Sequence, residues 1–399
     1  MRHFAFLDDA RRAELFHRLP EYIAPEGERL QVATALGATL YSPGTRVDLA
    51  ADARRQGRAG VMSMVFCLED AVADDEVDGA EQNVIAALMA LSNVPRGELP
   101  MIFVRVRDEP QLTRIVRTLG ERAGALAGFV LPKFGDETGA AQLEAVEAAS
   151  EQLGRRLWAM PVLETPEIIY RESRVDALLA IRRLLDKHVD NVLAVRIGAT
   201  DLCGLFGLRR DRDLTIYDLS VVRECIGDIV NVCGRDGSHL ITGPVWEYFS
   251  SPERLWVSPL RVTPFEQAHE GPLRQQLIST DLDRLMREVV LDKANGLLGK
   301  TVIHPNHVAA VHALLVVTHE EFVDARTVLD GNAGGVRRSD YGNKMNELRP
   351  HRAWAEVVLR RAAVFGVLAE GATFVDVLAA AHEFAGEALD GDTLVRTTG

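Results

Sequence analysis

Cysteine is scarce in this chain, which has four cysteines among 399 residues. No two of them form a CxxC pair, and four are too few for a disulfide scaffold, so we predict reduced, buried thiols. Histidine is more frequent, with eleven residues. No HExxH motif occurs, however, and a zinc site built from His304, His307 and His312 is disfavoured. The sequence therefore gives little support for a sulfur- or imidazole-based metal centre.

Long apolar runs are also missing, because no stretch approaches the roughly 18 residues that span a bilayer. The first ten residues, MRHFAFLDDA, include two acids before a signal-like apolar region can form. Basic residues are outnumbered, since 45 Lys and Arg against 58 Asp and Glu give a net charge of −13. An acidic surface repels phosphate backbones. We therefore expect a cytoplasmic protein that binds neither a membrane nor nucleic acid.

Short apolar runs recur along the chain, with Ala- and Glu-rich helical segments such as 138–153 and 166–185 between them. The runs are continuous rather than alternating, which favours parallel strands covered on both faces. They lie at residues 37–41, 61–68, 101–106, 128–131, 157–163, 192–197, 239–242 and 301–303. Eight strand–helix units predict an α/β fold of the (β/α)8 TIM-barrel type. A doubly wound open sheet is the alternative if the strand count is off by one or two.

The predicted organisation has three parts. Residues 1–35 form an N-terminal helical extension, residues 36–307 the barrel, and residues 308–399 a C-terminal helical region with helices over 308–330 and 350–388. Within the barrel, residues 250–270 carry three prolines and are expected to form a loop insertion. The Gly-rich loop 331–347 is either a lid or inter-subunit arm, or a solvated linker.

Polar side chains follow most of the predicted strands. In a parallel barrel, the carboxyl ends of the strands form one rim, where active-site residues lie. The residues expected at this rim are Glu69, Asp70, Arg105, Lys133, Glu164, Asp201 and His304. A single polar residue at a strand end would mean little, but seven at one rim predict a functional site.

Glu164 and Asp201 follow the fifth and sixth strands, which should be neighbours about 4.8 Å apart. Two carboxylates that close repel by about 4 kcal/mol at an effective dielectric constant near 20. A divalent cation removes this cost, and oxygen-only ligands favour Mg²⁺, with Mn²⁺ possible. The alternative is a surface carboxylate paired with an arginine.

Arg105 lies in the apolar segment Phe103-Val104-Arg105-Val106-Arg107. Strand alternation predicts that Arg105 and Arg107 share one face. A buried guanidinium needs an anionic partner because an unpaired buried charge is costly. The partner is either a substrate carboxylate held in a bidentate fork or a structural ion pair with Glu69 or Asp70, and both can hold at once.

Seven motifs, in chain order, resemble those of the citrate lyase β-subunit family within the HpcH/HpaI aldolase superfamily. They are LYSPG at 40–44, CLEDAV at 67–72, FVRV at 103–106, VLPK at 130–133, LET at 163–165, GATDL at 198–202 and GKTVIHP at 299–305. The resemblance covers roughly residues 36–360. The longer termini resemble a bacterial branch found with tellurium-resistance gene clusters.

The resemblance implies a (β/α)8 barrel that binds Mg²⁺ through Glu164 and Asp201 and forms a homo-oligomer, often a trimer. It also implies a carbon–carbon lyase or aldolase. Its substrate would be a 2-oxo or hydroxy acid, or the CoA thioester of one. The reaction would pass through a metal-stabilised enolate that faces Arg105. The same chemistry could run in the bond-forming direction.

The candidate catalytic residues are Arg105, Glu69 and Asp70. Glu69 and Asp70 would orient Arg105 or relay protons through water. Residues expected to contact the substrate are Lys133, Ala199, Thr200 and His304. Alternatively, Lys133 forms a structural ion pair that supports the site without contacting the substrate, and His304 anchors the end of its strand.

Two positions depart from the family pattern. Cys67 stands where the family signature has its first Asp, and Asn346 stands in a C-terminal segment where many relatives carry Asp. That Asp is catalytic in some relatives and can reach a neighbouring subunit's site, whereas Asn cannot act as a carboxylate base. Malate-synthase-like and thioesterase-like chemistry is therefore disfavoured. The alternative function is a catalytically altered barrel that serves as a binding or assembly subunit.

Overall fold

The computed structural model describes residues 1–249, 282–331 and 334–384, which divide into two compact units. The first unit consists mainly of residues 24–249 and 283–308, and the second mainly of residues 2–23 and 309–384. The loop insertion expected at 250–270 lies outside the described residues. The predicted limits of the three sequence regions stay a prediction.

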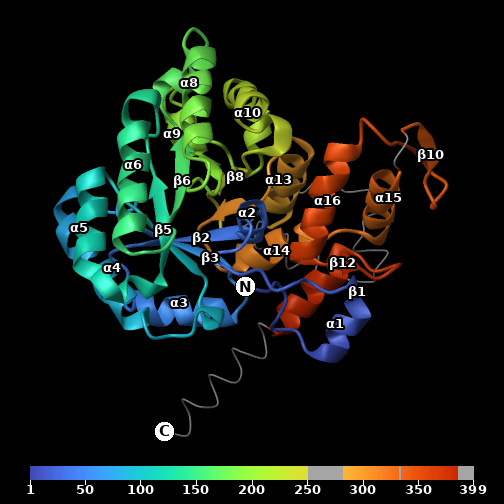
Figure 1. Ribbon diagram of the computed structural model, residues 1–399, viewed down its shortest axis with the longest axis horizontal. Coiled ribbons are helices and arrows are strands. Elements are labelled where there is room, and N and C mark those ends of the chain that lie inside the picture. The colour runs from blue at the N-terminus through green and yellow to red at the C-terminus, as the bar shows by residue number, and fades with distance from the viewer. Residues whose placement is uncertain (250–281, 332–333, 385–399) are drawn as a thin grey trace, which may run out of the picture. The chain divides into compact units, whose positions relative to one another are not determined.

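Eight parallel strands of the first unit close into a barrel (Figure 1). The last strand pairs with the first, through Ala38 with Lys300 and Leu40 with Val302, so the open-sheet alternative is excluded. In order around the barrel the strands are β2 (Ala38–Pro43), β3 (Ser63–Cys67), β4 (Met101–Arg105), β5 (Leu126–Leu131), β6 (Trp158–Leu163), β7 (Val195–Ile197), β8 (Ile241–Trp246) and β9 (Lys300–Val302). The predicted TIM barrel is confirmed.

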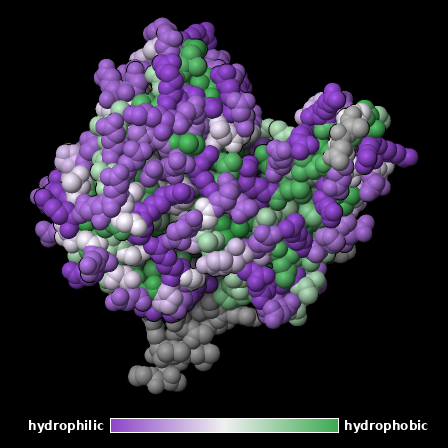
Figure 2. Space-filling model, in the orientation of Figure 1, coloured by the Kyte–Doolittle hydropathy of each residue, from purple (hydrophilic) through white to green (hydrophobic). Residues whose placement is uncertain are grey.

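Amphipathic helices cover the outside of the barrel. The described helices of this unit are α2 (Arg29–Ala35), α3 (Leu49–Arg58), α4 (Val77–Leu91), α5 (Glu109–Leu119), α6 (Asp136–Gln152), α7 (Pro166–Ile169), α8 (Arg174–Lys187), α9 (Ala199–Gly204), α10 (Ser220–Cys233) and α13 (Leu282–Ala294). Helix α6 buries Gln142, Leu143, Val146 and Ala149, spaced so that they share one face. The outer surface over α4, α5 and α6 is mostly hydrophilic (Figure 2).

Short 3-10 turns and buried thiols complete this unit. The turns are η1 (Asp74–Glu76), η2 (Arg96–Glu98), η3 (Gly120–Ala125), η4 (Ile216–Asp218) and η5 (Arg235–Gly237). The four cysteines, Cys67, Cys203, Cys225 and Cys233, are buried and form no disulfide, as predicted. No helix in the described part of the chain is long and apolar enough to cross a bilayer.

The helix predicted over 166–185 is two helices, α7 and α8. Tyr170, the residue after α7, has an extended backbone conformation. Arg174, in the first turn of α8, then reaches back to α7. Its guanidinium donates to the carbonyl oxygens of Ile168 at 3.1 Å and Ile169 at 2.6 Å. These carbonyls end a helix and have no intrahelical partner, so the side chain stabilises the break.

Strand β8 is longer than predicted. We expected it to stop before Gly243 and Pro244, but it continues to Trp246. Its pairing with β9 shifts register between Gly243 and Val245. Pro244 therefore lies at an irregularity, where its missing N–H removes no regular ladder bond. The extension brings Glu247, the next residue, to the carboxyl end of the strand.

The second unit has its own hydrophobic core. Its elements are α1 (Asp9–Leu15), β1 (Phe16–Arg18), most of α14 (Asn306–Leu315), α15 (His319–Asp330), β10 (Val336–Arg338), β11 (Met345–Glu347), α16 (Arg352–Phe365) and β12 (Val367–Leu368), and residues 374–384 are helical. Helices α15 and α16 pack through Phe322, Val328 and Val358. Within the segment predicted as a Gly-rich loop, β10 and β11 form an antiparallel pair.

Candidate active site

A cavity of about 820 Å³ lies at the carboxyl ends of the barrel strands. Its wall includes Tyr41, Arg105, Glu164, Arg196, Asp201 and Thr301. These residues belong to β2, β4, β7 and β9, except that Glu164 directly follows β6 and Asp201 lies in α9 after β7. Active sites of this barrel type lie at the same rim, so the cavity is the candidate active site.

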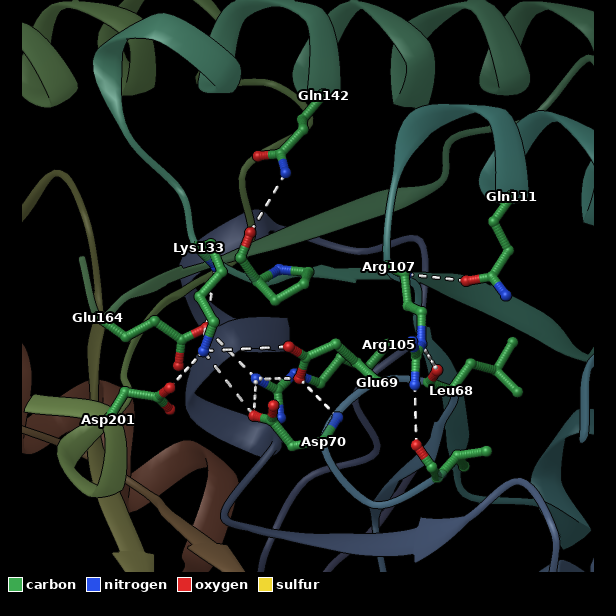
Figure 3. A network of polar contacts seen from close by, with 12 residues as sticks. Leu68, Glu69, Asp70, Arg105, Arg107, Gln111, Lys133, Gln142, Glu164 and Asp201 are labelled. Atoms are coloured by element: carbon green, nitrogen blue, oxygen red, sulfur yellow. Dashed lines mark hydrogen bonds and ion pairs between the residues drawn. The ribbon is translucent and has the colours of Figure 1, made fainter. Parts of the chain in front are cut away.

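Five consecutive strands supply the charged side chains of this rim, and Figure 3 shows them pointing toward one another. They are Glu69 and Asp70 after β3, Arg105 as the last residue of β4, Lys133 after β5, Glu164 after β6, and Asp201 in α9 after β7. The structure thus brings together six of the seven polar residues that the strand ends indicated.

Arg105 is the centre of an ion-pair cluster. Its Nη2 lies 2.7 Å from a carboxylate oxygen of Glu69, 3.0 Å from Asp70 and 3.3 Å from Glu164. The side chains of Arg105 and Glu164 are only 11% and 2% exposed, so water screens this contact weakly. The structural ion pairs considered for Arg105 are therefore present. Its Nε has no hydrogen-bond partner among the described residues.

Lys133 brings a second cation into the cluster. Its ammonium forms an ion pair with Asp201 and lies 3.7 Å from Glu164 and 3.9 Å from both Glu69 and Asp70. Its backbone N–H donates to Glu164 Oε1 at 2.9 Å. The backbone of Lys133 has a φ of 49°, a strained left-handed conformation for a lysine. One cation thus contacts carboxylates from three strand ends.

The cluster carries more negative than positive charge. Four carboxylates face two cations, which leaves an excess of two negative charges when all four are ionised. Burial raises the pKa of Glu164 to about 7, while Arg105 opposes the shift and Asp201 adds to it. Burial also raises the pKa of Glu69, again against the effect of Arg105. Desolvation and mutual repulsion therefore make this rim receptive to an additional cation.

Gly198 provides the space that the Glu164 carboxylate occupies. A Cβ at position 198 would lie 2.0 Å from Glu164 Oε2 and 2.5 Å from its Cβ, which is closer than atoms can approach. Gly198 follows β7, so the glycine allows a side chain from the neighbouring strand end to lie across it. The position of Glu164 therefore depends on the absence of a side chain at residue 198.

The other residues expected to contact substrate divide into two groups. Ala199 and Thr200 line the cavity, and the Thr200 hydroxyl donates to Glu247 Oε1 at 3.1 Å. His304 stacks on Phe249, with ring centroids 5.3 Å apart, and its Nδ1 accepts a hydrogen bond from a backbone N–H. None of the described contacts of His304 involves the six charged residues.

Arg107 does not share the face of Arg105. Strand β4 ends at Arg105, so the alternation that we assumed stops there. The Arg107 guanidinium instead donates to the carbonyl oxygen of Leu68 at 2.9 Å (Figure 3). It also donates to the carbonyl oxygen of Val72 at 2.8 Å and pairs with Asp74 at 2.6 Å. Arg107 thus secures the loop that carries Glu69 and Asp70.

Sequence reasoning overlooked two residues of the site. Arg196 lies in the middle of an apolar run and lines the cavity. A charged residue within such a run was the signal that could have identified it. Glu247 was overlooked because β8 was predicted to end too early. Of the two departures from the family pattern, Cys67 lines the cavity, whereas Asn346 lies in the second unit and donates to Asp324 at 2.7 Å.

The closed barrel and its charged rim define a TIM-barrel enzyme. A family model described as the C–C bond lyase of the TIM-barrel fold matches residues 30–367. The chain therefore belongs to this family and is a carbon–carbon lyase, which confirms the resemblance that its motifs indicated. None of the curated proteins is a significant match.

Solved structures share the fold. Protein CitE from Mycobacterium tuberculosis, in complex with magnesium, acetoacetate and coenzyme A, is 20% identical with a TM-score of 0.50, covering 83% of this chain and 99% of that one. A citrate lyase from Burkholderia xenovorans is 18% identical with a TM-score of 0.59, covering 83% of this chain and 93% of that one. At such identities the likeness concerns the fold.

Proposed function

We propose that this chain is a Mg²⁺-dependent lyase or aldolase that cleaves a C–C bond in a 2-oxo or hydroxy acid, or in the CoA thioester of one. The observation that carries the proposal is the convergence of four carboxylates on the Lys133 ammonium. With Arg105 as the second cation, the cluster has two negative charges in excess when all four carboxylates are ionised. The similar CitE protein was solved with magnesium, acetoacetate and coenzyme A, which supports the choice of metal and substrate class.

The residues at the rim fit a magnesium ion. No three His, Cys, Asp or Glu side chains in the described ranges gather closely enough to enclose a metal by themselves. Mg²⁺ does not require this, because it usually binds one or two carboxylates and keeps water and substrate oxygens. Glu164 and Asp201 both contact the Lys133 ammonium, which marks a point where a cation is favourable. Mn²⁺ accepts the same oxygen ligands.

The bound metal would supply Lewis-acid polarisation of the substrate carbonyl. Arg105 adds a fixed positive charge for the developing enolate oxygen, which is effective because the guanidinium is largely buried. Glu69 and Asp70 hold that guanidinium in place. Asp70 is 53% exposed, so it can exchange protons with water. These roles serve bond cleavage and bond formation alike.

Three further residues are assigned to the substrate. Lys133 is 46% exposed on a long, flexible side chain, so its ammonium can leave Asp201 for a substrate carboxylate. Thr200 is held at the cavity wall by Glu247 and, with Ala199, would contact the acid. His304 is assigned to the edge of the site, as a strand-end anchor stacked on Phe249.

The proposal is tested by incubating the purified protein with Mg²⁺ and a panel of oxo and hydroxy acids, free and as CoA thioesters. We expect cleavage products from at least one compound and a loss of at least about 100-fold in turnover in Asp201→Asn. Asp176→Asn, an exposed carboxylate on α8, is the matched control and should retain full turnover. Turnover that survives in Asp201→Asn would contradict the proposal.

A catalytically altered barrel that acts as a binding or assembly subunit is the second candidate. It is favoured by Cys67, which lines the cavity at the position of a family aspartate. Binding of panel compounds without any turnover would support it.

We further propose that the protein is cytoplasmic and forms a homo-oligomer. The family resemblance favours a trimer, and sedimentation of the purified protein tests this oligomeric state.

Mg²⁺ affinity should depend on pH through Glu164. The pKa of this carboxyl is raised to about 7, so below pH 7 it is mainly protonated and must lose its proton to bind a metal. Competition between proton and metal predicts an apparent Kd for Mg²⁺ about tenfold higher at pH 6 than at pH 8. Calorimetric titrations at the two pH values check this, and an affinity that stays constant would contradict it.

Gly198→Ala should weaken Mg²⁺ binding without touching a ligand. The added Cβ would collide with Glu164 Oε2, so the carboxylate has to move. We expect at least about a tenfold loss of affinity, as when the supports of a metal ligand are disturbed. Gly227→Ala on α10 is the control, because a Cβ there meets nothing within 4 Å. Equal affinities in the two variants would show that residue 198 does not position Glu164.

A further inference from the structure

Arg196 is a buried arginine that crosses the inside of the barrel. It lies on β7 and is 2% exposed. Its register neighbour on β6 is Val162, which lines the cavity as Arg196 itself does. The guanidinium thus lies at the wall of the candidate active site, on the inner side of the sheet.

All hydrogen-bond partners of Arg196 are neutral. Its Nη2 donates to the hydroxyl of Thr301, and its Nη1 lies 3.3 Å from the hydroxyl of Thr39 and 3.6 Å from the sulfur of Met160. The ring of Tyr41 lies 5.5 Å from the guanidinium carbon. Within the described part of the chain, no Asp or Glu forms an ion pair with this side chain. The barrel therefore holds a cation without a counter-ion.

Nearby groups do not supply the missing negative charge. Burial raises the pKa of the Tyr41 hydroxyl, which keeps it neutral at physiological pH. Thr242, the register neighbour of Arg196 on β8, has a buried hydroxyl with no hydrogen-bond partner among the described residues. An arginine remains protonated in proteins, and a buried charge without a counter-ion is costly. Buried charges in proteins are usually paired, so this guanidinium is available to an anion that enters the cavity.

We propose that Arg196, with Thr301 and Tyr41, forms a subsite for a second carboxylate of the substrate, so that the enzyme selects a dicarboxylic oxo or hydroxy acid. The proposal rests on the proposed function, which assigns the first carboxylate and its oxo or hydroxy group to the Glu164 and Asp201 end. Both ends border the same cavity. A guanidinium binds a carboxylate through two parallel hydrogen bonds, which distinguishes a carboxylate from a methyl group.

The test compares malate with 2-hydroxybutyrate, which share chain length and the hydroxy-acid head and differ in a carboxylate or a methyl group at the far end. Calorimetry with Mg²⁺, repeated in EDTA, gives the ratio of the two affinities. We expect the wild-type protein to bind malate about 10- to 100-fold more tightly. In Arg196→Gln the preference should fall to about twofold, with the affinity for 2-hydroxybutyrate unchanged.

Three controls keep the result interpretable. Arg54→Gln removes an exposed arginine on α3 and should keep the preference. Arg196→Lys retains the charge without the fork and should keep part of it. If Arg196→Gln does not fold, the proposal is still tested by the ratio of malate to 2-hydroxybutyrate affinity in the wild-type protein and in Arg196→Lys. No preference in the wild-type protein, or an undiminished preference in Arg196→Gln, would overturn the proposal.

The experiments distinguish failure of this proposal from failure of the proposed function. The malate preference is a ratio of affinities and needs no turnover. A protein that shows the preference without any lyase activity keeps the Arg196 subsite and loses the proposed function. A protein that cleaves monocarboxylic acids equally well keeps the proposed function and loses the subsite.

Discussion

Glu164→Gln should abolish Mg²⁺-dependent activity, with a fall of at least about 1,000-fold in kcat/KM, or about 4 kcal/mol of transition-state stabilisation. The amide keeps the size of the side chain and removes its negative charge. It also removes an anionic partner of Arg105 and Lys133. We expect calorimetric titration to show Mg²⁺ affinity lowered by at least about 100-fold, because one of two protein ligands is lost.

Two results would decide against this role of Glu164. Glu172→Gln, an exposed residue near the start of α8, is the matched control and should bind Mg²⁺ as the wild-type protein does. Unchanged Mg²⁺ affinity in Glu164→Gln would exclude the proposed metal site. Unchanged affinity together with lost activity would assign Glu164 to the positioning of Arg105 instead.

Arg105→Gln should lower activity without lowering Mg²⁺ affinity. We expect kcat/KM to fall by about 100- to 1,000-fold, because the fixed positive charge for the enolate oxygen is lost from a largely buried position. Mg²⁺ affinity at pH 9 should be no lower than in the wild-type protein, since a competing cation has left Glu164 and the carboxylates are ionised there. Steady-state kinetics and calorimetry on the same preparations separate the two effects.

Removal of Arg105 also leaves three carboxylates with Lys133 as the cation that they share. We therefore expect a lower melting temperature for Arg105→Gln without metal and a larger gain on addition of Mg²⁺ than in the wild-type protein. Arg105→Lys keeps a charge but not the planar guanidinium and should lose less activity. A loss of Mg²⁺ affinity in Arg105→Gln at pH 9 would mean that Arg105 organises the metal ligands rather than the enolate oxygen.

The barrel and its rim could be predicted because both depend on local pattern. Continuous apolar runs separated by helical segments indicate parallel strands, and the carboxyl ends of such strands meet at one rim. Glu164 and Arg105 are 59 residues apart in the chain, yet each borders the end of an apolar run. Their position at one rim follows from the topology, whereas their direct contact was not among the ion pairs predicted for Arg105.

The position of each strand end was less predictable. Arg107 was expected on the same face as Arg105. Strand β4 ends at Arg105, however, and the Arg107 guanidinium donates to backbone carbonyl oxygens. Strand β8 passes through Pro244 because its register with β9 shifts there, which no local signal indicated. Such ends depend on pairing with neighbouring strands that are distant in the sequence.

The amino-acid sequence by itself determined the TIM barrel, the family and the group of charged residues at one rim, because periodicity and strand-end residues are local properties. Only the tertiary structure decided which charges neutralise one another. Lys133 reaches Asp201, 68 residues away, while Arg196 meets only neutral partners among the described residues. Side-chain direction and burial inside a closed barrel depend on all eight strands at once, and burial determines the strength of every ion pair.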